Sequence, residues 1–600
     1  MSPRRRPRGS SAVRSLAPLL VALGLPLAAS AVAGPGRGTE GTRDGEAIYR
    51  RGVLPSGAPL TATVAGDVPL EGVSAACTTC HQRSGMGSVE GRVWVPPITA
   101  PILGASRGSG PRLRPGYDDA ALARTLREGV DVAGRPLDPL MPRYDLRPED
   151  LEALTSYLHG LGARVPPGVS EREIRFATVV TPDADPGRVQ AMLDVFDGFF
   201  RGKNVQVRSL ARFGTQRGTF RTWTLETWRL TGEPSGWAGQ LRAFYAKDPV
   251  FALLGGVGEA EWGPVDDFCE ENEVPCLLPN VDAPPASAGR SYYTLYVSRG
   301  VELEAAAVAA EIARDPSPAR VVQLVPERGP GRAGADALRA ALADRKDISV
   351  RNRIVVPGVF AGRTLAARNV GSSRAIHART RPGRSRKPMP ARRARTHRSK
   401  PRRRPDGRRG VALVTQTSND GRSRSLAAAG TPVARSRRIV VFWIPPAGLA
   451  RSALEGEESE DPWDRAFVSS TVLDGEPAAL TARALPRSEI VHPFTRPDEL
   501  GRRLANLEIW LRTRGVPKGV RRVQDQALLA CTLAGDALMH EFRDFDREYF
   551  LELVDHAGSN QTVSAFHARL SFGPGQRLLE KGCWLVPGSG DAKAARWVTP

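Results

Sequence analysis

The segment CTTCH, residues 77–81, is the feature that most limits what this chain can fold into. Cys77 and Cys80 are separated by two residues, and His81 follows the second cysteine directly. Two thiols at this spacing can form a redox-active dithiol, supply half of a zinc site or hold a covalently attached prosthetic group. These three kinds of site need different compartments and different neighbouring segments, so the rest of the sequence can distinguish among them.

The N-terminal segment has the order of a secretory signal peptide. Five arginines within the first 14 residues precede an apolar run, residues 16–34, that contains the small-x-small pattern AVA at 31–33. The sequence therefore predicts a signal peptide over residues 1–33 and export to a bacterial periplasm. A membrane anchor is the alternative, but the run is short and contains two prolines. No later stretch is long and apolar enough to span a bilayer, so we expect no membrane span in the mature chain.

Export favours a covalently attached group over the other two chemistries. C-x-x-C-H is the c-type haem attachment signature, in which both thiols are joined to the haem and the histidine binds the iron. A zinc ribbon would need a second C-x-x-C or a histidine pair, and neither lies nearby. A thioredoxin-like site would need a helix directly after the cysteines, and HQRSGMGSVEGRVWVPP predicts none. We therefore expect one covalent haem c on Cys77 and Cys80, with His81 as an iron ligand.

The flanks of the motif predict a small helical domain over residues 34–163. DGEAIYRRGV, residues 44–53, can form a short helix, and apolar residues recur at helical spacing from 148 to 161. Residues 40–163 resemble a class I cytochrome c, which implies an all-α domain whose first and last helices cross. The resemblance also implies that Met141, in an M-P loop before the last helix, is the second axial ligand of the iron.

Three details of that resemblance stay open at this point. The carbonyl of either Pro96 or Pro97 should orient the iron-binding histidine. Met86 is a rival axial ligand, but it lies five residues after His81 and should stay on the histidine's side of the haem. PSGAPLTATVAGDVPLEG, residues 55–72, is an insertion that we expect to form a loop or a small ribbon.

Beyond a proline-containing linker at 164–173, apolar strands alternate with helices through residues 174–600. This alternation predicts parallel sheets with helices on both faces. One of the expected strands is NVQVRSLARF, residues 204–213. PVFALLGGVGEAEWGPVDDFCEENEVPCLLPN and RIVVFWIPPAGLARSAL resemble segments of the two-lobed type I periplasmic binding proteins of the amino-acid kind. The resemblance implies an α/β two-lobed domain with a ligand cleft. The candidate cleft residues are Glu259, Asn280, Ser298, Arg299 and Trp443.

The formal net charge of +21 is concentrated in one segment. Residues 363–409 hold 16 arginines and 2 lysines against one acid, so the remainder of the mature chain is near neutral and no nucleic-acid partner is expected. The surrounding segment 357–437 interrupts the second lobe. It is a basic disordered loop that binds anionic surfaces, a nucleic-acid-binding segment, or a translated frameshift.

The other four cysteines fall into two pairs along the chain, Cys269 with Cys276 and Cys531 with Cys583. In an exported protein each pair is either a disulfide or two buried thiols. No nucleophile elbow or zincin motif is present, so we expect no hydrolase, and the haem motif favours an electron-transfer protein over an enzyme. The sequence instead predicts one-electron transfer to a redox partner, a dehydrogenase or an oxidase. The alternatives are a ligand-sensing receptor with a small-molecule ligand and, least favoured, a peroxidase.

Overall fold

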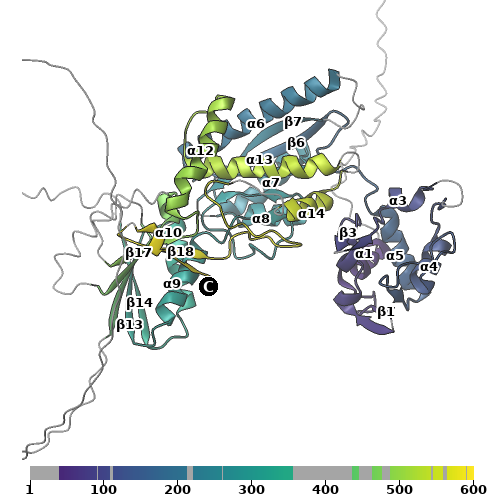
Figure 1. Cartoon of the computed structure of the whole chain (residues 1–600), viewed down its shortest axis with the longest axis horizontal. Helices are drawn as coiled ribbons and strands as arrows, with labels where there is room; N and C mark the ends of the chain where they lie inside the picture. The colour runs from purple at the N-terminus through teal and green to yellow at the C-terminus, as the bar shows by residue number, and fades with distance from the viewer. Residues whose placement is uncertain are drawn as a thin grey trace, which may run out of the picture. The chain divides into compact units, whose positions relative to one another are not determined.

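The computed structural model describes residues 40–355 and 436–600 (Figure 1). Shorter gaps in the description lie at 66, 91, 109–112, 213–220, 260, 445–462, 476–486, 542–544, 558–563 and 590. The predicted signal peptide and the arginine-rich residues 363–409 lie outside the described residues. Within the described ranges, none of the helices has the length and apolar character that a membrane span requires.

The first part of the described chain is organised around two crossing helices, α1 (Glu40–Arg51) and α5 (Pro148–Gly160). The helices cross at Gly45, where a Cβ atom would lie only 2.0 Å from the carbonyl oxygen of Ala153. Beside the crossing, the rings of Tyr49 and Tyr157 have centroids 5.2 Å apart. Both predicted helices are therefore confirmed, and the glycine permits their close approach.

The expectation of an all-α domain is too narrow, because the insertion at 55–72 forms a β-ribbon. Its two strands pair antiparallel, and the first also pairs with a short strand directly after Met141. The ribbon is held because Leu60 and Ala62 turn into the domain's apolar core while their neighbours face solvent. The remaining elements are β1 (Thr61–Val64), β2 (Val68–Glu71), α2 (Thr78–His81), β3 (Ser88–Glu90), β4 (Val93–Val95), α3 (Ala100–Gly104), α4 (Asp119–Glu128) and β5 (Arg143–Tyr144).

The second part of the chain begins with a parallel sheet in the order β11-β9-β6-β8-β10-β12, with β7 paired to the other side of β6. Its strands are β6 (Glu173–Val180), β7 (Thr222–Arg229), β8 (Ala252–Leu254), β9 (Val257–Gly258), β10 (Cys276–Leu277), β11 (Asn280–Val281) and β12 (Thr294–Leu295). Buried runs such as the ATVV of β6 are typical of a parallel sheet covered on both faces.

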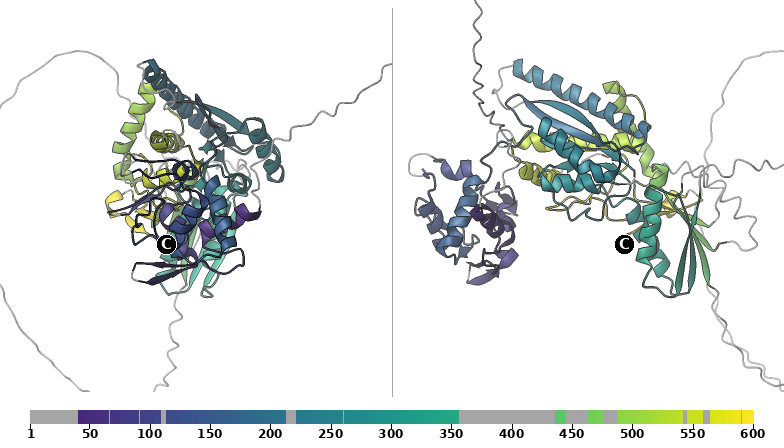
Figure 2. Two further views of the ribbon diagram at one scale, coloured as in Figure 1. Left: turned by 90° about the vertical axis from the view of Figure 1, so that its right-hand side faces the viewer. Right: turned by 180° about the vertical axis from the view of Figure 1, so that it is seen from behind.

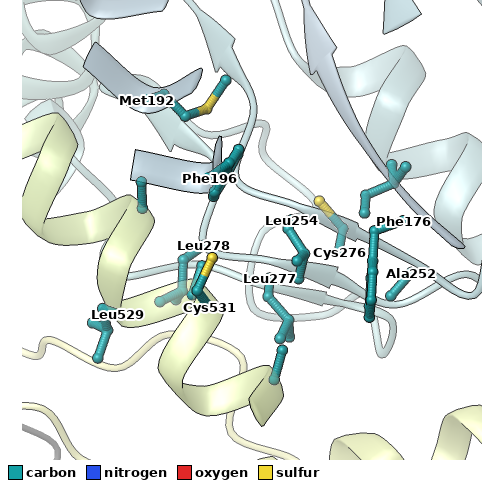
Figure 3. Close-up of a cluster of buried hydrophobic side chains, with 14 of the residues drawn as sticks. Phe176, Met192, Phe196, Ala252, Leu254, Cys276, Leu277, Leu278, Leu529 and Cys531 are labelled. Carbon is teal, nitrogen blue, oxygen red and sulfur yellow. The ribbon is translucent and has the colours of Figure 1, made fainter. Parts of the chain in front are cut away.

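Helices from two distant stretches of sequence cover this first sheet (Figure 1). The covering helices are α6 (Pro186–Arg212), α7 (Trp237–Lys247), α8 (Gly263–Glu271), α12 (Pro497–Arg514), α13 (Arg521–Glu541) and α14 (Arg547–Ala557). One apolar core joins them to the strands, and Figure 3 shows Phe196 of α6, Leu277 of β10 and Leu529 of α13 within it. The predicted strand at 204–213 is wrong, because residues 204–212 continue α6.

A second seven-stranded sheet has the order β14-β13-β15-β16-β17-β18-β19, parallel as far as β17 and antiparallel beyond it. Helices α9 and α10 lie along this sheet (Figure 2) and share its apolar core. The elements are α9 (Val301–Ala313), β13 (Ala319–Val325), α10 (Pro330–Ala341), β14 (Ile348–Ile354), β15 (Arg437–Phe442), β16 (Arg465–Ser469), β17 (Ser488–His492), β18 (Cys583–Pro587) and β19 (Arg596–Val598). The described residues of 174–355 and 436–600 thus form the two lobes that the sequence predicts.

The described chain passes between the two lobe cores three times. It leaves the first core after Val297 and enters the second at Val301, returns between Val491 and Phe494, and leaves again between Leu579 and Cys583. We call these three passages, residues 297–301, 491–494 and 579–583, the hinge segments.

Candidate haem site and interlobe cleft

The CTTCH motif folds as a single helical turn, which places both thiols and the imidazole on one short element. The turn closes through a 2.8 Å hydrogen bond from the backbone N–H of His81 to the carbonyl of Cys77. Cys77 and His81 are buried, Cys80 is half-buried, and neither cysteine is in a disulfide. The motif therefore offers two reduced cysteines and one histidine at an apolar surface.

His81 is held by its Nδ1 atom, which lies 3.0 Å from the carbonyl oxygen of Pro96. A carbonyl can only accept a hydrogen bond, so Nδ1 carries the proton and the lone pair is on Nε2. Among the described residues Nε2 has no hydrogen-bond partner. Burial lowers the pKa of His81, partly opposed by the bond to Pro96, so the ring is neutral and can bind a metal. Of the two prolines left open by the sequence, Pro96 is the one that orients the histidine.

The loop after His81 is kept in place by unusual backbone conformations. Gln82 has a φ of 62°, and its carbonyl accepts a 2.8 Å hydrogen bond from the hydroxyl of Tyr49 on α1. Gly87 has a φ of +75°, and a Cβ atom there would lie 2.1 Å from the carbonyl oxygen of Val95. The hairpin of β3 and β4 that follows returns the chain so that Pro96 meets the imidazole.

Met141 packs against the same apolar cluster that contains Cys77, together with Leu126 and Tyr144. The Tyr144 hydroxyl donates to the carbonyl of Ala75, just before the motif, at 3.1 Å. This bond ties the strand after Met141 to the segment that enters CTTCH. Met86 is not part of that cluster. Tyr49 and Tyr144 are site residues that the sequence did not single out, because a lone tyrosine carries no motif.

The donor set fits a c-type haem. Two cysteines outside any disulfide and an imidazole with an available nitrogen lie on one helical turn, and the Met141 thioether packs against the apolar cluster that contains Cys77. Soft sulfur and imidazole ligands in apolar surroundings suit haem iron. The roles of Cys77, Cys80, His81 and Met141 as haem-binding residues stay predictions.

The cleft between the two lobes is occupied by the chain's own charged side chains. Arg522, at the start of α13, makes two hydrogen bonds of 2.9 and 3.1 Å to the carboxylate of Asp282. The same guanidinium reaches Asp474 of the second lobe at 3.1 Å. Arg188, at the start of α6, adds a 3.0 Å bond to Asp282. This set, which we call the cleft ion cluster, links the lobes directly.

Little space remains beside the cleft ion cluster. A cavity lined by Asp282, Arg522 and hinge residues has a volume of about 20 Å³. A water molecule needs about 10–15 Å³ on this measure, so the cavity holds a single water at most. A solute the size of an amino acid would require the lobes to separate and the ion cluster to rearrange.

Of the candidate cleft residues, only Ser298 lines this cavity. Trp443 belongs to the second core, where its indole N–H donates to Gln323 at 2.7 Å. Asn280 is fully buried, and Glu259 and Arg299 do not line the cavity. Sequence reasoning missed the cleft ion cluster because its members are far apart along the chain and carry no shared motif.

Comparison with known proteins identifies the first domain. The family model for cytochrome c matches residues 72–162, which include the whole CTTCH motif and Met141. This segment is a cytochrome c domain. None of the curated proteins compared with the chain matches it significantly.

Among solved structures, the full chain is similar to several substrate-binding proteins. One is a substrate-binding periplasmic protein from Ralstonia solanacearum, with 12% identity, a TM-score of 0.41, and coverage of 71% of this chain and 100% of that one. Another is a fatty acid ABC transporter substrate-binding protein from Thermomonospora curvata, with 10% identity, a TM-score of 0.39, and coverage of 73% and 94%. A leucine-binding protein from Thermotoga maritima has 11% identity, a TM-score of 0.38, and coverage of 71% and 98%.

The four cysteines outside the cytochrome c domain are buried free thiols. Cys531 lies in the first lobe's core and Cys583 in the second, so these two are not paired. Cys269 and Cys276 are neighbours in the first core, and burial raises the pKa of Cys269 well above its ordinary value. The sequence left both disulfides and buried thiols open, and in the structure these four cysteines are buried thiols.

Proposed function

We propose that the chain is an exported c-type cytochrome that transfers single electrons through one covalent haem. The seating of His81 carries the proposal: its Nδ1 is bound to the Pro96 carbonyl, its Nε2 has no hydrogen-bond partner among the described residues, and the two cysteines of the motif, neither of them in a disulfide, precede it. The cytochrome c family of residues 72–162 supports covalent haem and an extracytoplasmic location. The redox partner would be a dehydrogenase or an oxidase in the same compartment.

Each residue of the site has a separate task in this proposal. Cys77 and Cys80 would tether the haem, His81 and Met141 would bind its iron, and Pro96 holds the imidazole in one orientation. A bound haem c supplies a one-electron couple, and histidine–methionine ligation raises its potential. The surrounding apolar cluster would exclude water and so tune that potential. The proposal assigns the chain no bond-breaking chemistry.

A pair of methionine variants tests the ligand assignment. Met141→Ala should keep the covalent haem, because Cys77, Cys80 and His81 are unchanged. It should lose the weak red absorption band typical of methionine ligation, lower the reduction potential and let imidazole or carbon monoxide bind. Pigment retention after denaturing electrophoresis, absorption spectra and potentiometric titration measure these properties.

Met86→Ala is the matched control and should resemble the unmodified protein in all three properties. The reverse result, with Met86→Ala altered and Met141→Ala unchanged, would overturn the ligand assignment. A purified exported protein without covalent haem would overturn the electron-transfer proposal itself.

The alternative is a ligand-responsive receptor in which the two lobes control how the cytochrome c domain docks on a redox partner. The observation that favours it is the pair of lobes joined by three hinge segments, a layout suited to opening and closing. A solute that binds the folded lobes should raise their thermal midpoint by mass action. Screening amino acids, alcohols and organic acids tests this alternative, which fails if none shifts the midpoint.

A further inference from the structure

A larger cavity, which we call the hinge pocket, shares Phe494 with the small cavity beside the cleft ion cluster and has no lining residue in the haem site. Its volume is about 160 Å³. Two of the three hinge segments contribute to it, together with the first turns of α12 and the last two strands of the second sheet. The lining residues are Pro493, Phe494, Arg496, Glu499, Arg503, Ala568, Arg569, Glu580, Trp584 and Trp597.

One wall of the hinge pocket is a cation held against two indoles. Trp584 and Trp597 meet edge to face, with ring centroids 5.1 Å apart. The guanidinium carbon of Arg569 lies 4.8 Å from one ring centroid and 4.6 Å from the other. Stacking on aromatic faces leaves the N–H edge of a guanidinium free, and this edge matches the two oxygens of a carboxylate.

Three arginines line the hinge pocket, and among the described residues only one of them is paired with acidic side chains. Arg496 is paired with Asp498 at 2.6 Å and with Glu499 at 3.1 Å. Within the described ranges, by contrast, neither Arg503 nor Arg569 has a carboxylate partner. Arg503 makes one 3.3 Å hydrogen bond to the Ser564 carbonyl, which leaves most of its donors unused. Two cations that have no paired carboxylate at one cavity favour an anionic ligand.

A buried carboxylate in the lining of the hinge pocket adds a second requirement. Glu580 is 3% exposed, and its Oε1 lies 3.1 Å from the Nδ1 of His567. Its Oε2 is also buried and has no hydrogen-bond partner among the described residues. A buried acceptor without a donor is costly to leave unpaired. A ligand with a hydroxyl or an ammonium group could donate a hydrogen bond to Glu580 Oε2. That donor would also lie between Glu580 and the ligand's own anionic group.

We propose that the hinge pocket binds a short organic acid that carries a hydrogen-bond donor beside its carboxylate, such as a 2-hydroxy acid or a 2-amino acid. The carboxylate would bind Arg569 and Arg503, the donor would face Glu580, and a short carbon chain would contact Phe494. An apolar cavity of about 150 Å³ accommodates benzene, so a ligand of about six heavy atoms fits the volume. The site is separate from the haem, and binding does not depend on electron transfer.

Four compounds with three carbons separate the two requirements. L-Lactate and L-alanine carry the acid and a donor, propionate carries the acid alone, and propane-1,2-diol carries donors alone. Isothermal titration on the full-length, haem-loaded protein should show binding of lactate, alanine or both. Propionate should bind about tenfold more weakly or worse, since one hydrogen bond to a charged group is lost. The diol should not bind, and comparing lactate with alanine identifies which donor the pocket prefers.

Arg569→Gln, with Arg512→Gln as the control, tests the location. Both arginines are exposed, so neither change should disturb the fold, and Arg512 lies on α12 outside the pocket. Arg569→Gln should weaken binding of the preferred acid about tenfold or more, and Arg512→Gln should leave it unchanged. Failure of both lactate and alanine to bind at millimolar concentrations would overturn the proposal, as would equal affinities for lactate, alanine and propionate. The proposal would also be overturned if Arg569→Gln and Arg512→Gln bound the preferred acid with equal affinity. Haem content and potential, measured on the same samples, judge the electron-transfer proposal separately.

Discussion

Replacing Asp282 by asparagine should destabilise the two lobes far more than the same change at Asp474. Asp282 is 5% exposed and binds both Arg522 and Arg188. Its loss leaves two buried guanidinium groups to share the half-exposed Asp474. Removing the shared buried partner of two arginines costs about 3–5 kcal/mol. Asp474 is half-exposed, and its removal leaves Arg522 paired with Asp282, so its cost should be about the 0–1 kcal/mol of a surface pair. We therefore expect Asp282→Asn to lower the free energy of unfolding by about 3–5 kcal/mol and Asp474→Asn by about 1 kcal/mol or less.

The effect should depend on pH with a definite sign. Burial acts to raise the pKa of Asp282, but Arg188 and Arg522 outweigh it and leave the pKa below its ordinary value. A carboxylate whose folded pKa is depressed stabilises the fold above its unfolded pKa, about 3.9, and loses that contribution as the pH falls through the folded pKa. The difference between the protein and Asp282→Asn should be complete at pH 7 and should shrink below about pH 4.

Urea unfolding followed by tryptophan fluorescence measures the stability of the lobes, and the haem absorption band follows the cytochrome c domain independently. Asp282→Asn should lower the urea midpoint of the fluorescence transition and leave that of the haem absorption transition unchanged. The reasoning would be refuted if Asp474→Asn were as destabilising as Asp282→Asn. It would also be refuted if the Asp282→Asn protein unfolded within about 1 kcal/mol of the unchanged one.

Three further predictions follow from single buried or strained positions. Burial raises the pKa of Glu304 to about 7, so the folded state should lose stability as the pH rises from about 4.5 through 7. Glu304→Gln should reduce that loss, which is measured by comparing the urea midpoints at pH 5 and pH 8. Gly87→Ala should greatly reduce haem attachment, judged by pigment yield, whereas Gly57→Ala, also at positive φ but with nothing within 4 Å, should cost only about 1 kcal/mol. Trp443→Phe leaves the amide oxygen of Gln323 without its donor and should lower the stability of the second lobe by about 1–3 kcal/mol in the same urea assay.

Local sequence patterns were enough to predict the parts of this chain that short-range chemistry determines. The CTTCH turn, the helix that begins at Pro148 and the alternation of strands and helices all depend on neighbours within a few turns of chain. The ribbon at 55–72 was only an open alternative, because its pairing with the strand after Met141 joins segments about eighty residues apart.

Residues 204–212 show why a local pattern can mislead. Val205 and Val207 alternate with polar residues as in a strand, yet Val207 is buried and Val205 is 62% exposed on the continued helix α6. The side chain of Asn204 binds the backbone of Trp223 through two hydrogen bonds, of 2.8 and 2.9 Å. Tertiary contacts of this kind override β-propensity. The same limit applies to the cleft ion cluster and the hinge pocket, whose members meet only in the folded lobes.

The way the two lobes share the chain determines the order in which they can fold. The cytochrome c domain is contiguous and is complete once residue 162 has been made. The first lobe needs α12, α13 and α14 for its core, and the second needs β18 and β19, so neither can close until the last part of the chain has been synthesised. Such long-range closure is slow and leaves apolar surface exposed meanwhile. A C-terminal truncation would therefore yield an intact cytochrome attached to two incomplete lobes that are prone to aggregate.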